Sequence, residues 1–181
     1  MPALFGALFL MTFSIFFSSF LSAKVYMTNE QFFEQVSKQN PSAKFKTKTI
    51  WLKKTIQSKI TNILDHKYPK LRLRYKISKN NDSPTSIWYL DEIGKERPIT
   101  FGVSVKDDRI QAIRVLEFRE SRGYEINIPS FASQFENIGV DEKKNLDKNI
   151  DGITGATMSV SAMKKVARLA ILLHHSVKEI P

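Results

Sequence analysis

Apolar and basic residues alternate strictly from Leu71 to Ile77, a pattern typical of a half-buried strand. Three more runs rich in β-branched and aromatic residues follow, at 86–93, 99–105 and 109–118. Only short turn sequences separate them. Because consecutive strands joined by short turns pair with each other, these runs predict an antiparallel meander.

Other segments show the spacing of helices. Thr28 and Gln31 have the form of a capping box, so a short helix is predicted to follow and to end before Pro41. A second helix is predicted over about 48–66, with an apolar face opposite Lys53, Lys54 and Lys59. A closing helix is predicted over about 158–177 from an apolar stripe made of Met158, Met163, Val166, Ala167, Ala170, Ile171 and His174.

These elements predict an α+β fold in which an antiparallel sheet packs against helices. We divide the chain into residues 1–23, an N-terminal helical extension over 24–70 and a main domain over 71–181.

Residues 2–23 carry no charged side chain. Such a segment is either a cleaved signal peptide or a membrane anchor, and the sequence leaves both open. In either case we expect the rest of the chain in the periplasm or on the outer face of the cytoplasmic membrane.

The composition limits the chemistry. The chain has no cysteine, which excludes disulfides, thiolate catalysis and iron–sulfur clusters. The three histidines are too dispersed for a metal site, and we expect them to be partly exposed helix residues. No metal ligands and no catalytic residues are predicted.

The net charge is +10, and the segment 35–81 holds thirteen Lys or Arg against one acidic residue, Asp65. This basic region is either a solvated face or a surface that docks on an anionic membrane or on an acidic redox partner. We expect Arg72, Arg74 and Lys76 to point outward. Nucleic acid is not expected as a partner of an exported protein.

The sequence Asp-Gly-Ile-Thr-Gly-Ala-Thr at 151–157 stands directly before the closing helix. A helix start offers unpaired N–H groups and the positive end of the helix dipole, which suit a phosphate group. The alternative is an ordinary Thr-capped helix with glycine in the preceding loop.

This stretch resembles the flavinylation motif of the FMN-binding domain family, whose members include subunits of sodium-pumping and Rnf-type electron-transport complexes. In that family a flavin transferase esterifies FMN, through its phosphate, to the last Thr of the motif. The resemblance makes Thr157 the covalent attachment site. The other motif residues are Asp151, Gly152, Thr154, Gly155 and Ala156.

Two further segments match the family. Residues 119–126 resemble the flavin-pocket loop, which implies that Glu120 and Ser121 lie along the flavin and that Gly123 allows close backbone approach. Residues 129–135 resemble the short helix that follows this loop. Tyr124 or Phe131 either stacks on the flavin ring or belongs to the core. The resemblance covers about residues 86–178.

The resemblance implies an extracytoplasmic electron-transfer flavoprotein with covalent FMN, a flavin transferase for its maturation and a membrane or periplasmic redox partner. Two alternatives remain. One is an exported non-redox module that binds through its basic face, and the other is a flavin-dependent reductase of a small acceptor.

Overall fold

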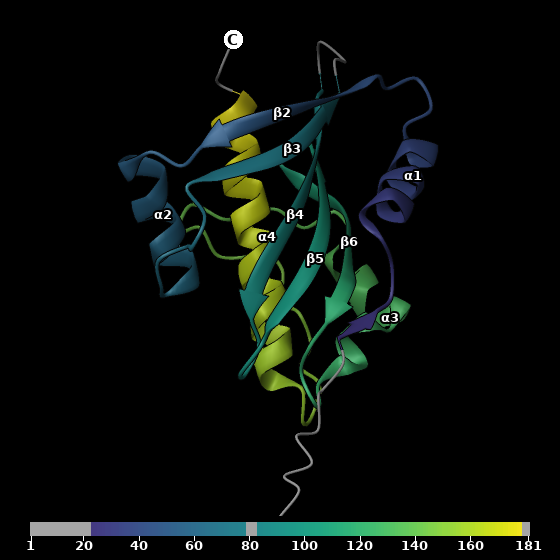
Figure 1. Cartoon of the computed structure of the whole chain (residues 1–181), viewed down its shortest axis with the longest axis vertical. Helices are drawn as coiled ribbons and strands as arrows, with labels where there is room; N and C mark the ends of the chain where they lie inside the picture. The colour runs from purple at the N-terminus through teal and green to yellow at the C-terminus, as the bar shows by residue number, and fades with distance from the viewer. Residues whose placement is uncertain (1–22, 79–82, 179–181) are drawn as a thin grey trace, which may run out of the picture.

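A computed structural model describes residues 23–78 and 83–178. The chain forms one six-stranded antiparallel sheet in the order β1-β6-β5-β4-β3-β2 (Figure 1). The strands are β1 (Lys24–Val25), β2 (Phe45–Trp51), β3 (Arg72–Ser78), β4 (Thr85–Ile93), β5 (Pro98–Lys106) and β6 (Arg109–Phe118). The helices are α1 (Asn29–Gln39), α2 (Lys54–Leu64), α3 (Pro129–Ala132) and α4 (Thr157–Lys178), with 3-10 turns η1 (Tyr124–Asn127) and η2 (Ser133–Phe135). The predicted α+β class is confirmed.

The meander is the centre of the sheet. Strands β4, β5 and β6 pair as consecutive antiparallel neighbours, and β3 pairs with β4. The β5–β6 hairpin turns through Asp107 and Asp108, whose φ angles are 52° and 60°. Positive φ at both central residues matches the right-handed twist of the strands in a two-residue hairpin. The four strands predicted from 71 to 118 are therefore confirmed.

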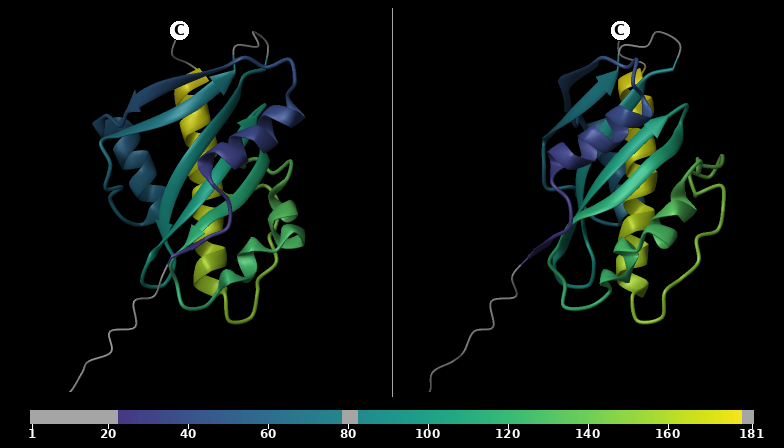
Figure 2. Two further views of the ribbon diagram at one scale, coloured as in Figure 1. Left: turned by 45° about the vertical axis from the view of Figure 1, so that its right-hand side comes forward. Right: turned by 90° about the vertical axis from the view of Figure 1, so that its right-hand side faces the viewer.

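Helices cover both faces of the sheet. On β4, Trp88 packs into the larger core with α4, and its neighbour Ile87 packs into a second cluster with Phe32 of α1. Successive strand residues point to opposite faces, so the two helices lie on opposite sides of the strands (Figure 2). Gly102 of β5 allows α1 to pack closely on the sheet, because a Cβ added at Gly102 would lie 2.6 Å from Phe32 Cδ1.

Helix α1 begins as predicted. Gln31 donates its backbone N–H to Thr28 Oγ1, and the Gln31 side chain accepts from the Thr28 N–H, which completes the capping box. The helix ends at Gln39, before Pro41. The closing helix is also confirmed, as the 22 residues of α4.

The prediction of a helix from 48 was wrong over its first part. Residues Phe45–Trp51 form β2, which pairs along its whole length with β3, and the helix spans only Lys54–Leu64. Alternating Thr47 and Thr49 suit a strand, and pairing with β3 outweighs the helical spacing of Ile50 and Ile56. The segment 24–70 thus contributes α1 and α2 and also both edge strands, β1 and β2.

The expected signal peptide or anchor falls on residues 1–22, outside the described part of the chain. Within the described ranges, every helix is too short or too polar to cross a bilayer.

Candidate functional site

The start of α4 separates a buried residue from an exposed one. Ala156 is 2% exposed, and its carbonyl accepts the N–H of Val160 at 2.9 Å. Thr157, the first residue of α4, is exposed. Gly155 has a φ of 85°, which strains any residue with a Cβ. The backbone at Ala156 is therefore fixed in the core while the Thr157 side chain faces outward.

The loop before the motif is held from two sides. The Asp151 N–H donates to Gln134 Oε1 at 2.9 Å, and Lys164 Nζ donates to the carbonyl of Ile150 at 2.9 Å. Asp151, Gly152 and Thr154 are exposed. Gln134 lies in the 129–135 segment, so this short helical stretch supports the motif directly.

A second loop packs against the start of α4. Gly123 is buried with a φ of 89°, and an added Cβ would lie 2.3 Å from Ser159 Oγ. The close approach that the structure shows at Gly123 is to α4, and the approach to the flavin stays a prediction. The contact with α4 brings residues 120–123, which follow β6, next to the motif.

The Glu120 carboxylate braces the turn between β4 and β5. Its Oε1 accepts backbone N–H groups from Lys95, Glu96 and Arg97 at 2.6, 2.6 and 2.8 Å. Gly94 leaves room for it, since an added Cβ there would lie 2.8 Å from Oε1. Glu120 thus has a structural task that the sequence alone does not reveal.

These loops enclose a hollow of about 260 Å³ at the start of α4. Its lining comes from the β4–β5 turn (Lys95 and Glu96), from the loop after β6 (Glu120, Ser121 and Arg122) and from residues 155–159. Two cations, Lys95 and Arg122, and two carboxylates, Glu96 and Glu120, share this lining, and Lys95 Nζ lies 3.5 Å from Glu96 Oε1. The feature that suits a phosphate here is the start of α4, with its unpaired N–H groups and the positive end of the helix dipole.

Of the residues predicted for the site, Glu120, Ser121, Gly155, Ala156 and Thr157 line the hollow together. Gly123 does not line the hollow but packs against Ser159, which does. Asp151, Gly152 and Thr154 lie outside the lining. No sequence pattern pointed to four further lining residues, Lys95, Glu96, Arg122 and Ser159. The sequence analysis also placed Met158 on the apolar stripe of the helix, but Met158 is 52% exposed at this hollow.

Phe131 and Tyr124, the two candidates for stacking on the flavin ring, differ in their exposure. Phe131 is 6% exposed and packs edge to face with Phe135, their ring centroids 6.0 Å apart, so it belongs to the core. Tyr124 is 56% exposed and remains available to a ligand.

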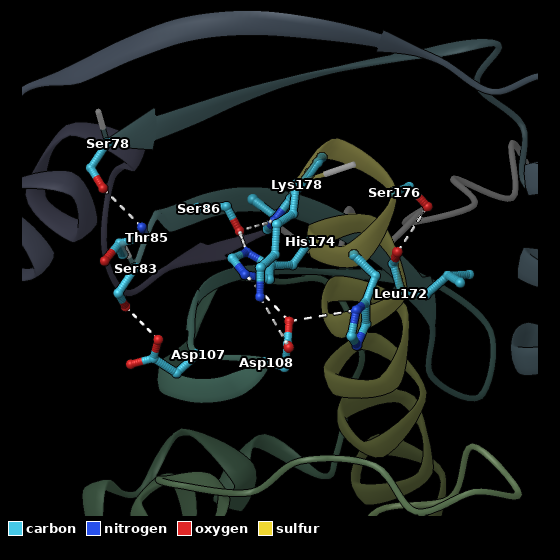
Figure 3. A network of polar contacts seen from close by, with 12 residues as sticks. Ser78, Ser83, Thr85, Ser86, Asp107, Asp108, Leu172, His174, Ser176 and Lys178 are labelled. Carbon is cyan, nitrogen blue, oxygen red and sulfur yellow. Dashed lines mark hydrogen bonds and ion pairs between the residues drawn. The ribbon is translucent and has the colours of Figure 1, made fainter. Parts of the chain in front are cut away.

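The expectation of partly exposed histidines was wrong for His174, which is fully buried. Ser86 Oγ accepts the Trp88 Nε1–H at 2.8 Å and lies 2.7 Å from His174 Nδ1 (Figure 3). With the ring proton on Nε2, which lies 3.6 Å from Asp108 Oδ1, the Ser86 hydroxyl donates to Nδ1. Burial lowers the pKa of His174 to about 4, although the nearby Asp108 carboxylate opposes the shift. His66 lies beyond the end of α2, with Nε2 3.1 Å from Glu92 Oε2. Over residues 23–78 and 83–178, no three His, Asp or Glu side chains are arranged to hold a metal ion.

Comparison with known proteins places the segment around this hollow in a family. Residues 94–172 match the family model of the FMN-binding domain. No curated protein and no solved structure matches the chain significantly. The matched segment runs from the turn braced by Glu120 through the 151–157 motif and into the second half of α4. These residues therefore form a domain of the FMN-binding domain family, as the resemblance predicted.

Proposed function

We propose that this chain is an extracytoplasmic electron-transfer flavoprotein that carries FMN covalently on Thr157. The observation that carries the proposal is the position of Thr157. Its hydroxyl-bearing side chain is exposed at the first residue of α4 and lines the hollow that Glu120, Ser121 and Arg122 help to form.

The residues around Thr157 fit a flavin phosphate. The first turn of α4 supplies N–H groups without partners inside the helix, and Arg122 supplies a cation, whereas Lys95 pairs with Glu96 and the Glu120 carboxylate accepts three backbone N–H groups. The hollow is smaller than the roughly 300–1,000 Å³ usual for a pocket that encloses a whole ligand. It therefore suits the phosphate end of FMN rather than the complete cofactor. Bound FMN supplies a centre that accepts and releases electrons.

Maturation requires a flavin transferase that uses FAD. In this step, the Thr157 Oγ1 bonds to the phosphorus of the FMN half of FAD. The bond from that phosphorus to the bridging oxygen breaks, AMP leaves, and the hydroxyl proton is released. No electrons are exchanged. Outside the cytoplasm this ester prevents the loss of flavin by dissociation.

Asp151 is suited to transferase recognition. Its backbone N–H is held by Gln134, while its exposed carboxylate has no hydrogen bond or ion pair with another described residue. A carboxylate left free at the surface can meet the transferase or the metal that it uses with FAD.

The proposed location and the proposed partners are inferred from the sequence alone. The uncharged segment 2–23 supports export, as a signal peptide or as an anchor, and the redox partner would then be a membrane or periplasmic protein. The basic region 35–81 supports attraction to an acidic partner or to an anionic membrane surface.

The attachment is tested by producing the protein together with an exported flavin transferase and measuring flavin that stays bound after denaturation. Wild type and Thr157→Ser should carry flavin, because both have a hydroxyl, and Thr157→Val should carry none. Thr49→Val is the matched control for a Thr to Val change at an exposed residue outside the motif and the hollow, and it should keep covalent flavin. Flavin on Thr157→Val, or none on wild type, would overturn the assignment.

Electron transfer is tested on the loaded protein. Reduced flavin should pass electrons to a redox partner from the same membrane and should turn over slowly with small soluble acceptors alone. Fast turnover of a small acceptor without a partner would favour the reductase. A protein that never acquires flavin, yet binds through its basic face, would favour the non-redox module.

A further inference from the structure

A larger hollow, of about 490 Å³, lies between α2, the loop at 140–144 and the second half of α4. Figure 1 shows α2 beside α4. An α-helix rises about 1.5 Å per residue, so Leu172 at this hollow lies about 22 Å along α4 from Thr157. The hollow is therefore separate from the proposed flavin site.

The floor of this hollow is aliphatic. Ile63 of α2 and Ile171 of α4 belong to the core, at 7% and 1% exposure, and Val140 and Leu172 pack partly buried against them. Among the described residues, the lining contains no Phe, Tyr or Trp ring on which a base or another flat ligand could stack. Burial of an aliphatic chain is the interaction that this floor offers.

The rim is strongly basic. Lys59, Lys143, Lys144 and Arg168 line the hollow together with His175. None of those Lys and Arg side chains has a carboxylate of another described residue within ion-pair distance. Asp65 pairs with Lys165, Asp141 accepts the N–H of Asn145, and Asp108 Oδ1 lies 3.5 Å from Nδ1 of the rim residue His175.

The loop that carries two of these cations is fixed to α4. Arg168 Nε donates to the carbonyl of Lys144 at 2.7 Å, and Lys144 has a φ of 63°. This contact uses one of the five N–H donors of the guanidinium and leaves the others for a ligand. The basic rim is thus set around the aliphatic floor in the absence of a ligand.

We propose that this hollow binds an anion with an acyl chain, such as a fatty-acid carboxylate. The chain lies on the floor formed by Ile63, Ile171 and Leu172, and the head group pairs with Lys59, Lys144 and Arg168. A neutral amphiphile would bury the same aliphatic surface but leave the cations without a counter-charge, so the site discriminates by charge.

The test uses dansylamino-undecanoate, a fluorescent acyl carboxylate, and its neutral methyl ester. Both are titrated into the full folded protein in vesicle-free buffer. The carboxylate should bind saturably with one site per chain, and the ester should bind at least about tenfold more weakly, equivalent to about 1.4 kcal/mol. Equal binding of the two probes, or no saturable binding, would overturn the proposal.

Variants locate the site. Lys59→Gln combined with Lys144→Gln should weaken carboxylate binding about tenfold or more. Lys53→Gln combined with Lys54→Gln removes the same charge from α2 and from the residue before it, outside the hollow, and should bind as wild type does. Circular dichroism melts establish that both variants are folded. If both double variants lose carboxylate binding equally, the effect is one of net charge and the proposal is wrong.

Competition identifies the source of the ligand. Displacement of the probe by dodecanoate would point to a free fatty acid, and stronger displacement by lysophosphatidylglycerol would point to a lipid. Both results support an acyl-chain anion. Displacement by dodecanol as effective as that by dodecanoate would contradict it. Thr157→Val should bind the probe normally, which separates this site from flavin attachment.

Discussion

Gly123 and Ser159 meet so closely that a Cβ at Gly123 would lie 2.3 Å from Ser159 Oγ. The two residues belong to the loop after β6 and to the first turn of α4. Their contact therefore positions the loop at 120–123 against the helix that carries Thr157. A glycine is required there for two reasons, the approach of Ser159 and the φ of 89°.

We expect Gly123→Ala to lower the free energy of unfolding by about 2 to 4 kcal/mol, because it combines backbone strain with a clash. Flavin loading by the transferase should fall as well, since the loop moves away from Thr157. Urea denaturation and covalent flavin content measure the two effects.

Two variants control this prediction. Gly152→Ala adds a Cβ that meets nothing within 4 Å, and its stability should stay within about 0.5 kcal/mol of wild type. Adding Ser159→Ala to Gly123→Ala removes Oγ and should recover part of the loss. If the double variant is no more stable than Gly123→Ala, the clash with Ser159 is not the cause.

Glu120 is expected to stabilise the β4–β5 turn rather than to contact the flavin ring. Glu120→Ala should cost about 1 to 2 kcal/mol, because three backbone N–H groups lose a charged acceptor at a solvent-accessible turn. Glu120→Gln keeps one carbonyl oxygen and should lose less. Glu142→Ala, which removes an exposed carboxylate elsewhere, is the matched control.

Thermal melts and the flavin absorption spectrum of loaded protein decide this point. A lowered melting temperature with an unchanged spectrum is the expected result for Glu120→Gln. An altered spectrum with an unchanged melting temperature would show that Glu120 acts on the flavin directly.

His174 is expected to make the fold acid-sensitive. Its pKa is about 4 in the folded protein against an ordinary value of 6.5, so the unfolded chain binds the proton more readily. Its contribution to stability is therefore present above about pH 6.5 and is lost as the pH falls toward about 4. Between about pH 7.5 and 4.5 the loss should be on the order of 2 to 3 kcal/mol.

His174→Asn tests this prediction, because the amide oxygen can accept from Ser86 but does not titrate in this range. The variant should fold at about pH 7.5 and lose less stability than wild type on acidification, as measured by urea unfolding at both pH values. Parallel losses in the two proteins would assign the acid sensitivity to other groups.

The sequence predicts the elements whose signal is local. Alternation from Leu71 to Ile77 suffices for β3, and the capping pair Thr28 and Gln31 suffices for α1. Strand β2 escapes prediction because most of its residues are exposed, which removes the alternation of buried and exposed positions. Its pairing with β3 is set by a partner more than twenty residues away, as in Thr49 opposite Arg74.

The candidate site also combines residues that a local sequence signal predicts with residues that only the fold brings together. The motif makes Thr157 the candidate for attachment, whereas Lys95 and Arg122 lie beside it only because the register of β4, β5 and β6 brings a turn and a loop to one end of α4. Helical spacing placed His174 on the buried face. Its residue type argued for exposure, and the partner that resolves the conflict, Ser86, is 88 residues away.

The last prediction concerns the basic ribbon, which we define as the face of β2 and β3 that carries Trp51, Arg72, Arg74 and Lys76. The register sets Trp51 opposite Arg72 and Thr49 opposite Arg74. Trp51 is 60% exposed, and the Arg72 guanidinium lies 5.6 Å from the centre of its ring. An exposed indole among cations is typical of a surface that meets anionic lipid head groups.

We expect the protein to sediment with vesicles that contain phosphatidylglycerol, not with pure phosphatidylcholine, and to be released by salt. Arg72→Gln combined with Arg74→Gln should weaken this binding about thirtyfold, because each basic residue near such a surface contributes about 1 kcal/mol. Lys143→Gln combined with Lys148→Gln removes the same charge from the loop before α4 and should have a smaller effect. If both double variants bind the vesicles equally weakly, net charge alone attracts the protein to the membrane. If the double variant at Arg72 and Arg74 binds as wild type does, the basic ribbon is only a solvated face.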